Sequence, residues 1–177
     1  HLDSFRSLLE ETNALVLSDY GKGGLSHIAQ MIEAARTKGI PILIDPKGDD
    51  YSRYEGATVI TPNRAELRQV VGPWKNETEL TMKAQALRAK LSLDYLLLTR
   101  SEEGMTLYKR DGQINVPAQA REVFDVSGAG DTVIAILSAM LATGMPIEDA
   151  VRTANQAGGI VVGKLGTAAV SYEELFD

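Results

Sequence analysis

The sequence has no cysteine among its 177 residues, which excludes disulfide scaffolds, thiolate zinc sites and cysteine nucleophiles. Histidine is nearly absent as well: only His1 and His27 occur, and neither lies in a catalytic motif. The longest apolar run, Val133 to Ala142, is far shorter than the roughly 20 residues that cross a bilayer. The polar start of the chain does not resemble a signal peptide, so we expect a cytoplasmic protein.

Positive charge is in the minority. The 18 Lys and Arg residues are outnumbered by 24 Asp and Glu, giving a formal net charge of -6. This balance argues against a nucleic-acid binder and against a polybasic membrane surface. The length predicts one domain or part of a larger one. Because the first residue is not Met, we expect a piece of a longer protein.

Apolar runs alternate with helical patterns along the chain, which predicts an α/β fold. Short apolar runs predict strands at Ala14–Ser18, Ile42–Ile44, Thr58–Ile60 and Tyr95–Thr99. Met105–Lys109 and Gln113–Val116 flank the turn signal Asp111-Gly112 and predict a hairpin. Helical spacing predicts helices at Leu25–Lys38, Asn63–Val71, Thr78–Leu91, Ala129–Thr143 and Ile147–Val162. Together they predict a parallel sheet covered on both faces.

Ligands of such sheets bind at the carboxyl ends of the strands, so the residues after each strand are the first candidates. They are unusually polar: Asp19 and Lys22, Asp45 and Lys47, Asn63 and Glu66, Thr99 and Ser101. Four converging ends with these side chains indicate a site for an anionic ligand and a metal. The alternatives are strand-end caps or turns for the two aspartates, and solvated surface positions for the two lysines. Arg100, Glu102 and Glu103 are expected to form a solvated rim.

The segment DVSGAGDT, residues 125–132, has the sharpest pattern. Gly128, Ala129 and Gly130 leave backbone N–H groups uncovered at a predicted helix start, which suits a phosphoryl group. Asp131 beside that anion fits a base that accepts a proton from an attacking hydroxyl. The alternative is that Asp131 only complements the helix dipole. The other strand ends favour the catalytic interpretation. No Walker A loop, protein-kinase motif or GxGxxG is present.

The motifs SDYGKG, DPK, TPNRAE, TRSEEG and DVSGAGDT, in this order, resemble those of the ribokinase-like (PfkB) carbohydrate kinases. The resemblance spans nearly the whole chain and implies a three-layer α/β/α Rossmann-like sandwich. It covers the C-terminal, nucleotide-binding and catalytic-base part of one kinase domain over residues 1–177. The N-terminal half and the lid of such a domain have no counterpart here. Within the family, LIDPKG, ATVITPNRAE, LLLTRSEEGM and VVGKLGT are most similar to kinases of a heptose 7-phosphate.

The resemblance also implies a role for each matching residue. Asp131 would deprotonate the anomeric hydroxyl of the sugar phosphate, and the amides of residues 128–130 would form the anion hole. Glu66, with Asn63, would organise Mg²⁺ through its waters. Asp125 and Ser127, with carbonyls of residues 163–171, would match a monovalent-cation site for K⁺. The implied ATP-binding residues are Asn63, Arg64, Ala65, Glu66, Thr99, Ser101, Gly104 and Asn155.

The implied function is ATP-dependent phosphorylation of the heptose 7-phosphate at O1, with Asp19, Lys22, Asp45 and Lys47 as candidate contacts to substrate or phosphate. A homodimer and a fused adenylyltransferase domain are implied for the full-length protein. Two alternatives stay open. One is a PfkB kinase of another sugar or a nucleoside, and the other is a nucleotide-binding piece that is inactive by itself. A Rossmann oxidoreductase is poorly supported without GxGxxG.

Overall fold

The computed structural model describes residues 9, 12–19, 27–118 and 129–162. These residues form a six-stranded sheet in which the strands follow one another in sequence order. The strands are β1 Leu15–Ser18, β2 Ile42–Asp45, β3 Val59–Ile60, β4 Tyr95–Thr99, β5 Met105–Lys109 and β6 Gly112–Val116. The first four are parallel, whereas β5 and β6 are antiparallel to their neighbours. The sheet is therefore mixed rather than purely parallel, because the short link from β4 to β5 cannot make a crossover.

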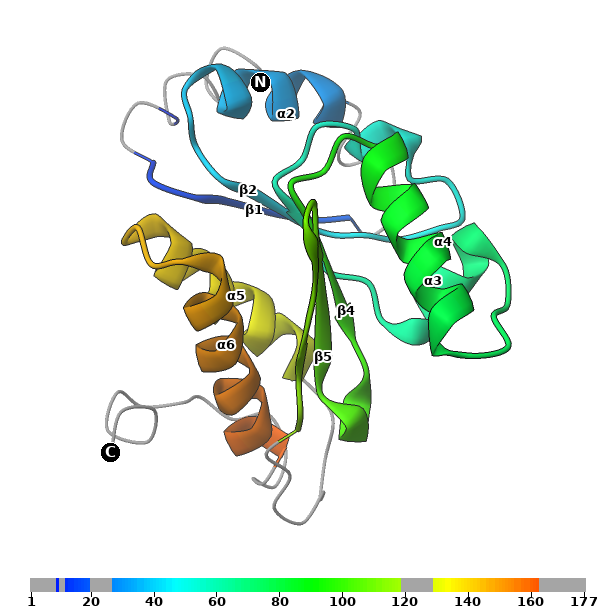
Figure 1. Cartoon of the computed structure of the whole chain (residues 1–177). Helices are drawn as coiled ribbons and strands as arrows, with labels where there is room; N and C mark the ends of the chain where they lie inside the picture. Colours follow the sequence, from blue (N-terminus) through cyan, green and yellow to red (C-terminus); the bar gives the residue numbers. More distant parts are fainter. Residues whose placement is uncertain (1–8, 10–11, 20–26, 119–128, 163–177) are drawn as a thin grey trace.

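Helices cover both faces of this sheet (Figure 1). One face carries α2, α3 and α4, and the other carries α5 and α6. Their bounds are α2 Ile28–Thr37, α3 Arg64–Val71, α4 Glu77–Lys90, α5 Ala129–Ala142 and α6 Ile147–Val162. Two short 3-10 helices, η1 Ser52–Tyr54 and η2 Ser101–Glu103, follow β2 and β4. The predicted α/β/α layers are confirmed.

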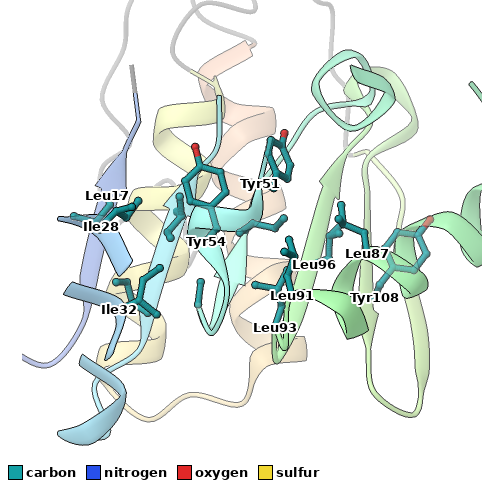
Figure 2. Packing of buried hydrophobic residues seen from close by; sticks show 14 of the residues in the cluster. Leu17, Ile28, Ile32, Tyr51, Tyr54, Leu87, Leu91, Leu93, Leu96 and Tyr108 are labelled. Atoms are coloured by element: carbon teal, nitrogen blue, oxygen red, sulfur yellow. The ribbon is translucent and has the colours of Figure 1, made fainter. Parts of the chain in front are cut away.

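Alternating side chains of the strands build the two cores. Ile44, Ile60 and Leu96 belong to the cluster beneath α2, α3 and α4, and each is fully buried. Leu43 and Leu97, one residue away along their strands, belong instead to the cluster under α5 and α6. Figure 2 shows the first cluster, in which tyrosine rings join the aliphatic side chains. Each fully buried aliphatic side chain contributes about 1.5–3 kcal/mol relative to an exposed one.

The hairpin predicted at Asp111-Gly112 joins β5 to β6 and is confirmed. Five helix ends differ from the sequence prediction by one residue and four agree with it, whereas α2 begins at Ile28 rather than at the predicted Leu25. Asn63 caps α3 rather than starting it, and α4 begins at Glu77. No helix in the described part of the chain is both long and apolar enough to traverse a bilayer.

Candidate active site

A cavity of about 250 Å³ lies where β2, β3 and β4 end and α5 begins. Its lining is mostly polar, as the strand ends predict. The lining residues are Asp45, Lys47, Thr61, Asn63, Glu66, Thr99, Gly130, Asp131 and Val133. The parallel topology brings these positions together, because the carboxyl ends of parallel strands share one edge of the sheet. Seven of the sequence candidates therefore line one cavity: Asp45, Lys47, Asn63, Glu66, Thr99, Gly130 and Asp131.

The start of α3 fixes two of them by a reciprocal capping box. The Asn63 Oδ1 accepts a hydrogen bond from the Glu66 backbone N–H at 2.8 Å. In return, the Asn63 backbone N–H donates to Glu66 Oε2 at 2.9 Å. A further bridge pairs Asn63 with Thr99 at the end of β4. The Asn-x-x-Glu spacing thus holds the Glu66 carboxylate at the cavity with one oxygen already engaged.

Lys47 is bonded to two carboxylates from different elements. Its Nζ lies 2.5 Å from Glu66 Oε1 and 3.2 Å from Asp45 Oδ1. Burial alone would lower the pKa of Lys47, but the hydrogen bond to Glu66 and the charge of Asp45 outweigh it and raise that pKa. We call Asp45, Lys47 and Glu66 the cavity cluster.

Three charged side chains near Asp45 affect its pKa: Lys47, Glu66 and Asp131. Burial raises the pKa of Asp45 above its ordinary value, and the Lys47 ammonium opposes this rise. The carboxylates of Glu66 and Asp131, which line the same cavity, raise the pKa of Asp45 further. Crowded carboxylates of this kind are typical of sites that receive a cation.

Asp131 lies in the first turn of α5 and is exposed to the cavity. Gly130 precedes it in the same turn, and a Cβ there would meet nothing within 4 Å. Open backbone at a helix start next to a cavity fits the predicted anion site, since a helix N-terminus favours negative charge. Gly128, and the cation-site candidates Asp125 and Ser127, lie outside the described residues, as does Lys22.

Asp19 was expected at the substrate, but it is 6 % exposed and is not among the lining residues. Its Oδ2 accepts a hydrogen bond from the Tyr54 hydroxyl at 2.6 Å and pairs with Arg53 Nη2 at 2.8 Å. The Tyr54 hydroxyl also accepts from the Lys47 backbone N–H at 3.1 Å. Asp19 therefore ties the end of β1 to η1 and to the Lys47 backbone. Sequence reasoning missed Arg53 and Tyr54, because the three-residue η1 in which they lie is too short to show a periodic pattern.

Two nucleotide candidates meet at a different place, around the end of β6. Gly104 has φ +86°, and a Cβ on it would lie 2.0 Å from the Val116 carbonyl oxygen. Asn155, which is 5 % exposed, donates from Nδ2 to the Pro117 carbonyl at 2.9 Å. Gly104 and Asn155 thus both contact residues 116–118, although neither lines the cavity. Their separation of 51 positions gives no hint of this pairing in the sequence.

Arg64 and Ser101 lie at the rim. Arg64 Nη2 donates to the Arg100 carbonyl at 3.1 Å, and its Nη1 pairs with Glu103 Oε1 at 3.0 Å. Ser101 begins η2 with φ +52°. Ala65 is exposed in the first turn of α3. None of these three candidates is among the cavity-lining residues.

The prediction that Arg100 belongs to a solvated rim is wrong, because Arg100 is buried. It is 9 % exposed, whereas Glu102 and Glu103 are exposed as expected. Its guanidinium pairs with Glu77 at the start of α4, with Glu103 at 2.8 Å, and with the Thr106 hydroxyl at 3.2 Å. We call Arg64, Glu77, Arg100 and Glu103 the outer cluster.

The described residues contain no group of three or more His, Asp or Glu side chains placed to hold a metal ion by themselves. Mg²⁺ in nucleotide sites is usually held by one or two carboxylates together with phosphates. Asp45 and Glu66 at one cavity supply that number of carboxylates. The residues present therefore fit Mg²⁺ that arrives with a nucleotide.

A charged cavity at the ends of parallel strands, beside a helix N-terminus with an acid in its first turn, is an arrangement suited to phosphoryl transfer. The sequence profile described as "pfkB family carbohydrate kinase" matches residues 1–174. The chain belongs to this family.

Its relatives include a protein from Bordetella bronchiseptica named D-beta-D-heptose 7-phosphate kinase. The two are 56% identical over 167 residues, which cover 94% of this chain and 53% of the relative. The Bifunctional protein HldE of Pseudomonas aeruginosa is 57% identical over 171 residues, covering 96% of this chain and 36% of that protein. The chain thus spans about half, or less, of the length of these relatives.

Solved structures show the fold. Arabidopsis thaliana ribokinase, in a complex with ribose and ATP, matches with a TM-score of 0.81 and 22% identity over 93% of this chain and 54% of that one. Escherichia coli phosphofructokinase-2, in a complex with potassium, matches with a TM-score of 0.80 and 22% identity over 98% and 60% of the two chains. The fold is therefore of the ribokinase type, and this chain is similar to part of that domain.

Proposed function

We propose that this chain is the nucleotide-binding and catalytic-base portion of a kinase that phosphorylates D-glycero-β-D-manno-heptose 7-phosphate at O1. The product would be the 1,7-bisphosphate, used in the synthesis of ADP-heptose for lipopolysaccharide. The observation that carries the proposal is Asp131 in the first turn of α5, lining one cavity with Lys47 and Glu66. It occurs in a chain 56% identical to a protein named as a heptose 7-phosphate kinase.

Asp131 is the proposed base. It accepts the proton of the O1 hydroxyl as that oxygen forms a bond to the γ-phosphorus of ATP, while the bond from the γ-phosphorus to the ADP oxygen breaks. The amides of Gly128, Ala129 and Gly130 would stabilise charge on the transferred group. Positioning and electrostatics would supply most of the rate enhancement.

The nucleotide would enter the cavity with its phosphates toward Thr99, Asn63 and Lys47. When bound, Mg²⁺ neutralises charge on the phosphates, and Asp45 and Glu66 are the residues that would hold it or its waters. The backbone near Gly104 and residues 116–118, braced by Asn155, would border the ribose and adenine. Their joint contact with one segment supports this placement.

Arg64, Ala65 and Ser101 would complete the nucleotide surface from the rim, and Asp19 would act by holding the Lys47 backbone. Lys22 would contact the substrate phosphate, and Asp125 and Ser127 would bind K⁺. The N-terminal remainder of the kinase domain would supply the sugar contacts. Within the described residues β1 is an edge strand with Val16 37% exposed, which is where further strands would fit. The whole protein would form a homodimer, with a fused adenylyltransferase domain.

The test is phosphoryl transfer by the full-length protein, with Mg·ATP and a panel of sugar phosphates, sugars and nucleosides. Phosphorus NMR and intact mass identify the product. We expect the heptose 7-phosphate to give a 1,7-bisphosphate at the highest kcat/KM. A higher value with another sugar or nucleoside would refute the named substrate and leave the kinase. No transfer to any acceptor, with ATP still bound, would favour a nucleotide-binding protein.

A further inference from the structure

Lys47 occupies an unusual position in the cavity. Among the lining residues of the described cavity it is the single cation, and Asp45, Glu66 and Asp131 are the acids around it. Its ammonium lies between Asp45 Oδ1 and Glu66 Oε1, at 3.2 and 2.5 Å. These two carboxylates come from the end of β2 and the first turn of α3, so Lys47 joins two elements. A nucleotide-bound cation at this place would need the same two carboxylate oxygens as ligands.

The backbone of Lys47 is held independently of its side chain. The Lys47 N–H donates to the Tyr54 hydroxyl at 3.1 Å, and the Lys47 carbonyl accepts from Arg53 Nη2 at 2.7 Å. Tyr54 in turn is bonded to the buried Asp19. The loop therefore stays in place when the ammonium moves. The Lys47 side chain is 37% exposed and carries its ammonium on a flexible four-carbon stem, so the ammonium is able to change partners.

The charge balance in the cavity favours a change of partners by Lys47 when a nucleotide binds. With Lys47 paired, the cavity has an excess of carboxylates, which repels a polyanionic nucleotide. A divalent cation beside Asp45 and Glu66 would lie at the same place as the ammonium, and two cations in one position repel each other. The Lys47 ammonium and a divalent cation therefore cannot both be bound to the carboxylates of Asp45 and Glu66 at the same time.

We propose that Lys47 is a displaceable internal cation. In the nucleotide-free protein its ammonium neutralises the Asp45–Glu66 pair, and when the nucleotide arrives with its divalent cation the ammonium moves from these carboxylates to the phosphates. The protein thus discriminates against free divalent cations and binds them only with the nucleotide. This inference rests on the proposed function in taking a metal–nucleotide complex as the ligand.

The test measures binding of Mn²⁺ alone, without nucleotide, to the full-length protein by electron paramagnetic resonance of free Mn²⁺. We expect weak binding by the natural protein and binding at least about tenfold tighter by Lys47→Met, because the competing charge is gone. Glu66→Gln in the Lys47→Met background should reverse the gain. An unchanged Mn²⁺ affinity in Lys47→Met would overturn the proposal.

Lys109→Met is the matched control. Lys109 also pairs with two carboxylates, Glu148 at 3.1 Å and Asp111 at 3.7 Å, but is not among the cavity-lining residues. We expect its Mn²⁺ affinity to equal that of the natural protein. A gain as large as that of Lys47→Met would mean that net charge alone explains the effect, and would overturn the proposal.

A second measurement follows the other half of the exchange. Calorimetry with Mg·ATP should show weaker binding by Lys47→Met, because the phosphates lose the ammonium, with partial rescue by Lys47→Arg. Tighter Mn²⁺ binding with undiminished Mg·ATP binding would contradict the movement of Lys47 to the phosphates. Failure of heptose 7-phosphate as acceptor would refute the proposed function alone, since neither binding experiment contains a sugar.

Discussion

Two ion clusters stand at the same end of the sheet and are built differently. In the cavity cluster a lysine, 37% exposed, lies between two acids that are 21% and 18% exposed. In the outer cluster the side chain of Arg100, 11% exposed, is paired with the side chains of Glu77 and Glu103, which are 65% and 49% exposed. The cavity cluster thus has an accessible cation and sheltered acids, and the outer cluster has the reverse.

The difference indicates what each cluster does. A guanidinium makes several directed hydrogen bonds at once, so Arg100 fixes the start of α4, η2 and β5 relative to one another. An ammonium is a compact charge that exchanges partners, which suits a place where a ligand arrives. We therefore expect substitutions in the outer cluster to change stability first and those at the cavity to change binding and turnover first.

The largest effect on stability is expected from Gly104→Ala, directly after η2 and next to Glu103 of the outer cluster. The new Cβ would lie 2.0 Å from the Val116 carbonyl oxygen and 2.6 Å from the Ala118 nitrogen, at φ +86°. Backbone has to move, so we expect a loss of at least about 3 kcal/mol in the free energy of unfolding, measured by urea denaturation. Gly144→Ala is the control, because its φ is +83° but its Cβ would meet nothing within 4 Å. That control should cost only about 1 kcal/mol; equal losses would show that the close approach is unimportant.

On the cavity side, Asp131→Asn should lower turnover by at least about 10²-fold, the lower range for a lost general base. Asp131 is exposed, so its replacement should leave the urea midpoint nearly unchanged. Mg·ATP binding should also persist. Kinetics, calorimetry and denaturation of one preparation separate these effects. Near-normal turnover would remove Asp131 from the role of base, and a large stability loss would break the contrast between the two clusters.

The cavity cluster could be predicted from the sequence because the topology of the sheet largely determines which residues meet at the cavity. Asp45 ends an apolar strand, and Lys47, Asn63 and Glu66 follow one. Parallel strands bring such positions to one edge of the sheet. The capping box was also readable, since Asn-x-x-Glu has the required spacing.

The outer cluster was not predictable by the same means. Arg100 and Glu77 are 23 positions apart, and their pairing depends on how α4 packs beside β4 and β5. A charged side chain after a strand is usually solvated, and only tertiary packing shows that Arg100 is buried. The hydrogen bond between Asp19 and Tyr54 could not be predicted for the same reason, because a side-chain contact across 35 positions leaves no local sequence pattern.

Arg100→Met sharpens the comparison from the outer side. It removes hydrogen bonds to Glu77, Glu103 and Thr106, but both acids are exposed enough to be rehydrated. Thr106 keeps its bond to Asn115 at 2.8 Å. We therefore expect a loss of about 1–2 kcal/mol by urea denaturation.

Arg100→Lys is the companion variant. It keeps the positive charge but loses the several directed N–H donors of the guanidinium, so it should recover less than half of the stability that Arg100→Met loses. Full recovery by lysine would mean that charge alone holds the outer cluster, and the contrast with Lys47 would then fail. Lys47→Met, by comparison, should change stability by no more than about 1 kcal/mol, since its side chain is partly exposed.

The smallest effect is expected from Tyr54→Phe, which tests how the cavity cluster is anchored. The hydroxyl donates to Asp19 and accepts from the Lys47 backbone, so its loss should cost about 1 kcal/mol at pH 8. Tyr51→Phe is the control: the Tyr51 hydroxyl is buried without a hydrogen-bond partner among the described residues, and its removal should cost nothing.

The pH dependence gives this last variant a second signature. Burial, and then the hydrogen bond to Asp19, raise the pKa of Tyr54 above its ordinary value. The unfolded chain therefore releases the Tyr54 proton first, at a pKa of about 10. The associated stability is fully present below that pH and is lost as the pH rises toward the folded-state pKa. The natural protein should accordingly lose stability faster above about pH 10 than Tyr54→Phe, and the gap between the two should shrink. Parallel stability curves from pH 8 to 11 would show that the Tyr54 proton is not held by Asp19, and the Lys47 backbone would then need another anchor.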